Sequence, residues 1–285
     1  MGVQDSRNKA KFSLNCNGKL LFIEKSIVMG IVNITQDSFF SSSRKLSLDE
    51  IVSTVIKMLD DGATIIDIGG QTSKPSSVAD GVEAEMGRVI PVMKELCKLF
   101  PKVIFSIDTY NSEVAIAAVE AGASLVNDIS GGQLDENMIA SVGKLGVPYI
   151  CTHIKGNPAT MQLNPTYDNV VKEVFDYFVR KIEECQQAGI KDIIIDLGFG
   201  FGKSLIHNYE LLQALEYFNV FNKPLLVGVS RKGMIHKYLA ITPEEALNGT
   251  TALHTLALER GATMLRVHDV KEAVEVVKLV NKTHS

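Results

Sequence analysis

The sequence predicts an α/β fold, a (β/α)8 TIM barrel with a short N-terminal β-hairpin. Eight short apolar runs rich in β-branched residues alternate with helical patterns along the 285 residues. In five of these units a glycine stands between the helical pattern and the next apolar run, where a left-handed residue commonly ends a helix. Eight such units in this length are typical of one barrel, so we expect a single domain over residues 1–285.

The hairpin is the first element along the chain. Residues 12–25 place Asn17-Gly18 between two short apolar segments, which favours a type I′ turn. In a barrel such a hairpin can cover the N-terminal mouth. The eight strands are expected near 27–33, 64–68, 103–107, 124–127, 148–152, 192–197, 225–229 and 263–267. The helical patterns span 48–61, 80–99, 112–121, 135–145, 168–188, 208–219, 243–260 and 270–281.

An open doubly wound sheet is the alternative fold, and it would normally carry a glycine-rich nucleotide turn. Gly202-Lys203-Ser204 matches the end of a Walker A loop, but Leu197 stands where that motif requires its first glycine. The glycines at 198, 200 and 202 alternate too strictly for the dinucleotide fingerprint. Both nucleotide motifs are therefore rejected, and the barrel is favoured.

The composition excludes several classes of function. The net charge of −4 gives no general attraction to nucleic acid or to an anionic membrane. The N-terminus is polar, and no apolar run is long enough to span a bilayer, so we expect neither a signal peptide nor a membrane partner. The four scattered cysteines show no metal-ligand spacing, which favours reduced thiols and a cytoplasmic location.

Polar residues stand at the carboxyl ends of the expected strands, where barrels collect their chemistry. Acids and amides follow the strands expected at 103–107, 124–127 and 192–197, whereas cations follow those expected at 64–68, 225–229 and 263–267. The residues are Asn33, Lys74, Asp108, Asn127, Asp128, Thr152, His153, Asp196, Arg231, Lys232, Arg266 and His268. A ligand with a donor-rich neutral ring and an anionic tail would match this division.

Asp196 ends a buried strand just before the loop Gly198–Gly202, and an unpartnered carboxylate there would cost free energy. A bound heterocycle with adjacent N–H donors would satisfy it, and so would a cap on its own loop; the sequence leaves both open. Structural interpretations exist for other residues too. Asp108 and Asp128 could cap helices, Arg231 could bridge carboxylates, and His153 is expected to be a satisfied core histidine.

Eight segments spread over residues 27–281 then point to one family. They read MGIVNITQDSF, DIGGQTSKP, FSIDTY, VNDISGG, THIKGNPATMQ, DLGFGFGKS, GVSRKGM and RVHDV, in this order. With these segments the chain resembles dihydropteroate synthases, and the resemblance implies an α/β barrel. It also implies the condensation of 6-hydroxymethyl-7,8-dihydropterin diphosphate with p-aminobenzoate, which gives 7,8-dihydropteroate and diphosphate in folate synthesis.

The resemblance implies site roles at the matching positions. Asp108, Asn127, Asp196 and Lys232 would bind the pterin. Asn33, Arg266 and His268 would bind the diphosphate, with Asn33 also near Mg²⁺, the expected cofactor. Ser73, Lys74, Pro75, Phe201 and Gly233 would shape the p-aminobenzoate site. Members of the family are commonly dimeric, so we expect a homodimer.

The chain departs from the common family pattern in its first two loops and around the pocket. The departures are Gln36 for Pro, Ser41-Ser42-Ser43 for Asp-Gly-Gly, Gln71-Thr72-Ser73-Lys74 for Glu-Ser-Thr-Arg, Thr152 where Met is frequent, Leu197 for Pro and Gly233 for Ser. Lys74 lacks the planar fork of an arginine. Gly233 lacks a hydroxyl near the expected p-aminobenzoate carboxylate.

Two other functions compete with the synthase. A methyltetrahydrofolate methyltransferase would share the pterin-binding acids and amides, but it would not need the cations Lys74, Lys232, Arg266 and His268. A pterin-binding protein without catalysis would tolerate the altered loops, but it would not need the intact SRK and RVHD segments.

Overall fold

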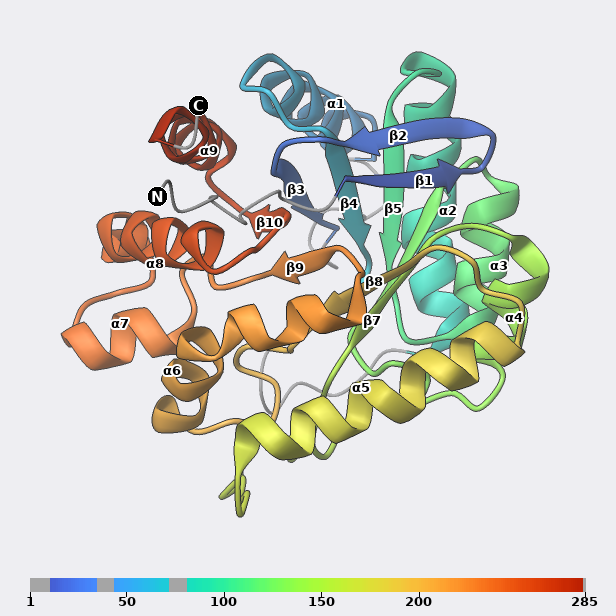
Figure 1. The fold of residues 1–285 in the computed structure, drawn as a ribbon. Coiled ribbons are helices and arrows are strands. Elements are labelled where there is room, and N and C mark those ends of the chain that lie inside the picture. Colours follow the sequence, from blue (N-terminus) through green and yellow to red (C-terminus); the bar gives the residue numbers. More distant parts are fainter. Residues whose placement is uncertain (1–10, 35–43, 72–80, 284–285) are drawn as a thin grey trace, which may run out of the picture.

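The computed structural model describes residues 11–34, 44–71 and 81–283 and contains a closed barrel of eight parallel strands (Figure 1). The strands follow one another around the barrel in chain order, and β10 closes it against β3. Their bounds are β3 Ile27–Asn33, β4 Ile65–Gly69, β5 Ile104–Asp108, β6 Leu125–Asp128, β7 Tyr149–Thr152, β8 Ile193–Asp196, β9 Leu225–Val227 and β10 Met264–Val267. The predicted barrel is confirmed.

Helices surround the barrel on its outer side, as Figure 1 shows. They are α1 Arg44–Asp60, α2 Val82–Leu99, α3 Ser112–Glu120, α4 Met138–Leu145, α5 Val170–Gln187, α6 Leu205–Gln213, α7 Gly233–Leu239, α8 Leu247–Glu259 and α9 Val270–Thr283. Two short 3₁₀ helices, η2 Leu215–Phe221 and η3 Glu244–Ala246, precede β9 and α8.

The helix expectations were wrong in two places. The pattern over 208–219 is split at Ala214 between α6 and the 3₁₀ helix η2, which ends at Asn222 in the left-handed region with φ 49°. The seven residues of α7 were missed, because a helix of two turns is too short to show a clear apolar period. Neither error moves a strand end.

The five glycines expected to end helices do adopt the left-handed region. Gly62, Gly122, Gly146, Gly189 and Gly261 have φ between 67° and 113°. Each therefore turns the chain directly from a helix into the next strand at the amino end of the barrel. The longer connections lie at the other end, where the functional residues were expected.

The hairpin of β1 (Phe12–Cys16) and β2 (Lys19–Ile23) closes the amino end of the barrel. Asn17 and Gly18 have φ 53° and 81°, as a type I′ turn requires. The buried hairpin residues Leu14, Cys16, Leu21 and Ile23 pack in one cluster with an inward-facing residue of every barrel strand: Met29, Ile65, Ile104, Leu125, Ile150, Ile194, Leu226 and Met264. The expected cover over the N-terminal mouth is thus confirmed (Figure 1).

A second, larger apolar cluster lies between the outer faces of the strands and the helices. Because strand side chains alternate, Phe105, Val126 and Ile195 point outward into this cluster while their neighbours point inward. Within the described chain, no helix is long and apolar enough to cross a membrane.

Candidate active site

Polar side chains replace apolar ones two residues further along the strands, on the same inward faces. On β3 and after β9 the position two residues beyond the apolar layer holds Ile31 and Gly228, respectively. On the other six strands this position is polar: Asp67, Ser106, Asn127, Thr152, Asp196 and Arg266. The first five are buried, and the Arg266 side chain is 18% exposed. The carboxyl end of the barrel, where barrels bind their ligands, therefore carries a layer of polar side chains directly above an apolar layer.

Arg266 joins three strands across this pocket. Its Nε donates to Asp67 Oδ2 over 2.7 Å, and its Nη2 donates to Asp108 Oδ2 over 2.5 Å. Asn127 Nδ2 donates to the same oxygen of Asp67 over 2.9 Å. The structure thus brings Asp108, Asn127 and Arg266 together, around a carboxylate that the sequence analysis had not selected.

Asp67 was missed because it lies inside its strand and not at the end. A signal was present: Asp67 is a single acid between Ile66 and Ile68, in an otherwise apolar run. Such a residue is rarely buried without a partner. Its partner, Arg266, is 199 residues away along the chain, so the pair could not be read from local sequence.

In this cluster, burial and the neighbouring charges act in opposite directions on the pKa values of Asp108 and Arg266. Burial raises the pKa of Asp108, while the charge of Arg266 opposes this rise. Burial also disfavours the charge of Arg266, but Asp67 and Asp108 outweigh it and raise the pKa of the guanidinium. Arg266 consequently stays charged, and it keeps two carboxylates at the pocket floor that would otherwise repel each other.

Asp196 ends β8 beside the glycine loop 198–203. Its Oδ1 accepts a hydrogen bond from the Gly198 N–H at 2.8 Å, and it makes no other hydrogen bond within the described residues. Burial raises the pKa of the Asp196 carboxyl, and the nearby charge of Lys232 opposes that rise. The expected local cap is present, but it uses one oxygen and leaves the other open to a ligand.

Lys232 lies between Asp196 and the same loop. Its Nζ donates to the Phe199 carbonyl at 2.7 Å and lies 4.6 Å from the centre of the Phe201 ring. Burial lowers the pKa of Lys232 to about 8, although Asp196 favours its charged form. An ammonium beside a ring and a carboxylate can serve an anionic or electron-rich ligand.

Lys203 was not selected as a site residue, yet it organises this wall of the pocket. Its buried Nζ donates to the carbonyls of His153, Gly198 and Phe201 at 3.1, 2.9 and 3.0 Å, and lies 2.9 Å from His153 Nδ1. Burial, with the charge of Lys203 nearby, lowers the pKa of His153 to about 2, so the imidazole ring is neutral. His153 is a satisfied core histidine, as expected.

The glycines of the loop permit this winding. Gly198, Gly200 and Gly202 all have positive φ, between 64° and 83°. A Cβ at Gly198 would lie 1.9 Å from the His153 carbonyl oxygen, and one at Gly202 would lie 2.1 Å from that of Lys155. Glycine is therefore required by both conformation and space, which explains the alternation that excluded a nucleotide motif.

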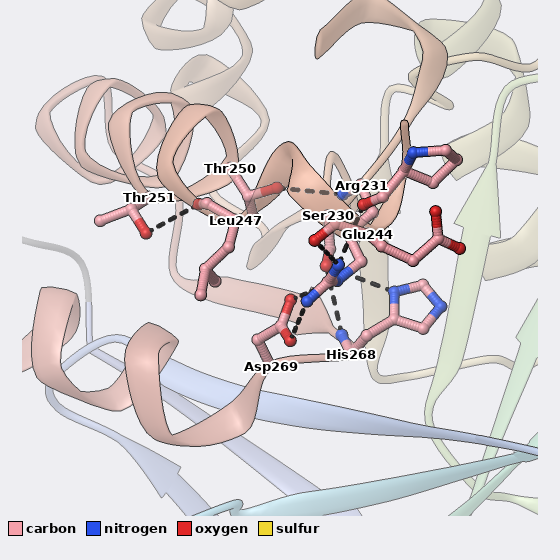
Figure 2. A network of polar contacts seen from close by, with 9 residues as sticks. Ser230, Arg231, Glu244, Leu247, Thr250, Thr251, His268 and Asp269 are labelled. Carbon is pink, nitrogen blue, oxygen red and sulfur yellow. Dashed lines mark hydrogen bonds and ion pairs between the residues drawn. The ribbon is translucent and has the colours of Figure 1, made fainter. Parts of the chain in front are cut away.

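Arg231 ties together the loops that follow β9 and β10, as Figure 2 shows. Its Nε and Nη2 donate to the two oxygens of Asp269 at 2.8 and 2.7 Å. Its Nη1 donates to the carbonyls of Pro243 and Glu244. The structural interpretation of Arg231, as a bridge to a carboxylate, is confirmed.

The sequence left open that Asp108 and Asp128 cap helices, and the structure shows other roles for both residues. Asp108 caps no helix, because its carboxylate pairs with Arg266. Asp128 caps its own loop: it accepts from the backbone N–H groups of Ser130 and Gly132 and from the Tyr149 hydroxyl, each at 2.7 Å.

The residues expected at the diphosphate lie on the adjacent strands β3 and β10. A Cβ at Gly69 would lie 3.3 Å from Asn33 Oδ1 and 3.6 Å from Asp108 Oδ2, so both oxygens flank that glycine. His268 follows β10, with its Nδ1 3.3 Å from Ser230 Oγ (Figure 2). No group of three or more His, Cys, Asp or Glu side chains able to hold a metal occurs in the described chain.

The p-aminobenzoate residues are only partly within the structure. Phe201 faces Lys232, and Gly233 is the first residue of α7. Ser73, Lys74 and Pro75 lie outside the described residues. Of the altered second loop, Gln71 is described: its Nε2 donates to Glu85 Oε2, which also accepts from Asn111 Nδ2 at 2.7 Å. A glutamate at 71 would instead bring a second carboxylate against Glu85.

Comparison with known proteins gives a consistent result. The model of the family described as pterin binding enzymes matches residues 29–268. Dihydropteroate synthase of Escherichia coli (strain K12) is 42% identical over 274 residues, covering 95% of this chain and 96% of that protein.

Solved structures agree with the sequence relatives. The Yersinia pestis dihydropteroate synthase, solved with a sulfonamide drug complex, superposes with a TM-score of 0.88 at 38% identity, covering 96% of this chain and 99% of that one. The Xanthomonas albilineans enzyme in complex with 7,8-dihydropteroate gives 0.85 at 35% identity, with the same coverage.

Proposed function

The chain belongs to the family of pterin-binding enzymes, among the dihydropteroate synthases, and on that premise we propose how its residues carry the reaction. The reaction joins 6-hydroxymethyl-7,8-dihydropterin diphosphate to p-aminobenzoate and releases 7,8-dihydropteroate and diphosphate. It transfers a pterinylmethyl group to an aryl amine, so the enzyme needs a pterin site, an anion site and an arylamine site.

Asp196 is the residue on which the pterin site depends. It is 6% exposed, and one of its oxygens has no hydrogen bond to any described residue. The pterin edge presents an amino group beside a ring N–H, and a carboxylate can accept from both. Asn127 and Asp108, which lie on β6 and β5 across the same pocket, complete the polar floor.

The carboxylates also fit the chemical step. As the C–O bond to the diphosphate breaks, positive charge develops on the methylene and is delocalised into the pterin ring. Asp196 is buried and the Asp108 side chain is 17% exposed, and negative charge in such surroundings of low dielectric stabilises that cation strongly. The aryl amine is largely unprotonated at neutral pH, so positioning replaces a strong general base.

The diphosphate is held by Asn33, Arg266 and His268 in this proposal. Arg266 is already fixed by Asp67 and Asp108 through Nε and Nη2, and its Nη1 makes no hydrogen bond to a described residue. A guanidinium held on one side can donate to a phosphate oxygen on the other without losing rotamer entropy. The carboxylates thus fix the direction in which Arg266 presents its charge.

We propose Mg²⁺ as the cofactor, bound mainly by the substrate phosphates. Mg²⁺ commonly uses one or two protein oxygens together with phosphate oxygens and water. The Asn33 oxygen beside Gly69 fits this requirement, and an all-protein cage is not needed. When bound there, Mg²⁺ would neutralise the charge of the leaving diphosphate.

The arylamine is proposed to bind over the glycine loop. Phe201 and Lys232 offer a ring and a cation 4.6 Å apart, which suits an aromatic carboxylate. Gly233 lies next in the chain, and Ser73, Lys74 and Pro75 of the second loop are assigned to the same site by the family resemblance. We also propose a homodimer, with exposed Tyr238, Leu239 and Leu256 on α7 and α8 available for an interface. A cytoplasmic location suits four free cysteines.

The test is diphosphate release from the pterin diphosphate with Mg²⁺, measured with and without p-aminobenzoate. Release coupled to dihydropteroate formation, and lost on removal of Mg²⁺, is the expected result. Methyl transfer from methyltetrahydrofolate without diphosphate release would favour the methyltransferase. Pterin binding without turnover would favour the non-catalytic protein.

A further inference from the structure

Ser230 follows β9 and lies beside His268, which follows the neighbouring strand β10 (Figure 2). The Oγ of Ser230 accepts a hydrogen bond from the His268 backbone N–H at 3.3 Å, and it lies 3.3 Å from the ring nitrogen Nδ1 of the same histidine. Ser230 is 4% exposed. One nearly buried hydroxyl therefore contacts both the backbone and the ring of a residue assigned above to the diphosphate.

The hydroxyl of Ser230 has a single proton, and its contacts decide where that proton points. A hydroxyl donates once and accepts with its lone pairs. The backbone N–H of His268 already donates to the oxygen, and Nδ1 is the acceptor that lies within hydrogen-bond distance of Oγ in the described part of the chain. Donation from Nδ1 instead would leave the nearly buried hydroxyl proton without an acceptor, which costs free energy. Ser230 therefore donates to Nδ1.

The hydrogen bond at Nδ1 also decides which nitrogen of the ring carries a proton. Partial desolvation, and after it the charge of Arg266, lower the pKa of His268, which favours the neutral ring. A neutral imidazole carries one N–H, and the hydrogen bond made by one nitrogen determines which of the two holds it. Because Nδ1 accepts from Ser230, the proton of His268 is on Nε2.

Nε2 is the ring nitrogen that remains available to a ligand. His268 as a whole is exposed, and its Nε2 makes no hydrogen bond to any residue that the structure describes. The charges of Arg266, Arg231 and Lys232 all act on this ring, so an anion is favoured beside it. Phosphate oxygens accept hydrogen bonds, so an N–H at this position attracts them, whereas a lone pair would repel them.

We propose that Ser230 is a positioning residue whose hydroxyl holds the His268 ring with its Nε2–H free to donate to the diphosphate. The inference rests on the assignment of His268 to the diphosphate made above. Ser230 acts only through the ring: it limits the rotation of the imidazole, and it disfavours the tautomer in which the Nε2 lone pair would face phosphate oxygens.

The tautomer can be read from long-range ¹⁵N–¹H correlation spectra of protein labelled with ¹⁵N-histidine. In the ligand-free protein, His268 should show a proton on Nε2 and an unprotonated Nδ1 that accepts a hydrogen bond. The signals of His268 are identified by their loss in His268→Gln. Ser230→Ala should shift the Nδ1 resonance to that of a nitrogen without a hydrogen bond. A proton on Nδ1 in the unsubstituted protein would overturn the inference.

The effect on the substrate should be confined to its diphosphate end. Ser230→Ala should raise the KM for the pterin diphosphate about fivefold, and it should leave the affinity for 6-hydroxymethylpterin, which has no phosphate, within about 1.5-fold. In a His268→Gln background, Ser230→Ala should not raise the KM further, because the ring through which it acts is gone. An equal rise in both backgrounds would show that Ser230 serves the loop and not the ring, and would overturn the inference.

Thr250→Val provides the matched control within the same network. Thr250 Oγ1 accepts from the Arg231 backbone N–H at 3.0 Å, and no hydrogen bond between described residues joins it to His268 (Figure 2). Each variant removes the acceptor of one backbone N–H, so the Tm should fall in both. Only Ser230→Ala should change the ring signals, and the same change in Thr250→Val would count against a specific role of Ser230.

Failure of this inference can be told apart from failure of the proposed function. If the protein turns over the pterin diphosphate and Ser230→Ala changes neither the ring signals nor the KM, the inference fails and the function stands. If the unsubstituted protein does not use the pterin diphosphate, the proposed function fails, and the role given to Ser230 fails with it.

Discussion

The two ends of the barrel are built from the same strands, but one end is sealed and apolar whereas the other is polar. At the amino end, eight inward-facing residues and four hairpin residues form a sealed apolar cluster. At the carboxyl end, six of the eight next inward positions hold acids, an amide, hydroxyls and Arg266, and three of their polar atoms have no hydrogen-bond partner among the described residues. On β8 the change occurs between Ile194 and Asp196, two residues apart on one face.

The difference shows where this protein gains stability and where it gives stability up. Burying Ile194 stabilises the fold, because apolar area leaves water. Burying Asp196 costs free energy, as the raised pKa of its carboxyl indicates. Hydrogen bonds to the bound ligand would offset this cost. Substitutions at the two ends should therefore separate folding from function.

The largest effect is expected at Asp196. Asp196→Ala should abolish measurable pterin binding, a loss of at least about 100-fold, since two hydrogen bonds to a charged acceptor disappear. Asp196→Asn keeps an acceptor for the Gly198 N–H but presents a donor to the donor edge of the ring. It should lose binding equally while the Tm changes little. Near-normal pterin affinity in either variant, measured by titration calorimetry, would remove Asp196 from the site.

The opposite result is expected at Ile194. Ile194→Ala should reduce the free energy of unfolding by about 2–5 kcal/mol, because it removes fully buried methyl groups and leaves a cavity. Denaturant unfolding measures the loss, and kcat/KM at a temperature where the variant is folded should be almost unchanged. A large loss of kcat/KM in the folded variant would show that the two layers are not independent.

Arg231 should combine both effects, because it is a structural residue within the functional end. Arg231→Ala removes the paired hydrogen bonds to Asp269 and frees the loops that carry Lys232 and His268. We expect kcat/KM to fall about tenfold and Tm to fall with it. In a double-mutant cycle with Asp269→Ala, the coupling energy should be about 1–3 kcal/mol. Additive losses would show that the pair is not a unit.

Lys232 should set the alkaline limit of activity. Its pKa is lowered to about 8, so the folded protein releases this proton before the unfolded chain does. The pH profile of kcat/KM should fall above about pH 8. Between pH 8 and the ordinary lysine pKa, the unfolded state holds more protons, so the contribution of Lys232 to stability rises as pH increases. Lys232→Arg, which stays charged, should lose this limb; an unchanged limb would assign it to another group.

The smallest effect is expected at Gly233. Gly233→Ser restores a hydroxyl at the first position of α7, and its Cβ would meet the flexible Lys237 side chain at 3.4 Å. The KM for p-aminobenzoate should fall about threefold, as one modest hydrogen bond allows, while pterin affinity stays the same. Gly233→Ala is the matched control without the hydroxyl, and an equal fall in that variant would attribute the effect to helix propensity.

Much of the fold could be predicted from the sequence because its signals are local. The short apolar runs of β7 and β8, the glycines after the helices and Asn17-Gly18 are each signals of a few neighbouring residues. The two-turn helix α7 and the split at Ala214 escaped, because short elements carry little periodicity. The polar strand ends could also be predicted, since parallel strands bring their carboxyl ends to one side.

The pairing of those polar groups could not be predicted in the same way. Asp67 and Arg266 are 199 residues apart, and Lys203 was set aside with the rejected nucleotide motif although it holds the pocket wall. The order of residues along a strand gives the face of each side chain, but not its distance from a side chain on another strand.

The sequence by itself determined the barrel, the sealed amino end and the set of residues available at the carboxyl end. These follow from periodicity and turn chemistry, which act over a few residues. Only the tertiary structure decided which acid pairs with Arg266, which oxygen of Asp196 remains open and which hydroxyl stays unpaired. Closing the barrel brings distant strands within hydrogen-bond distance, and electrostatic and hydrogen-bond energies depend on that distance.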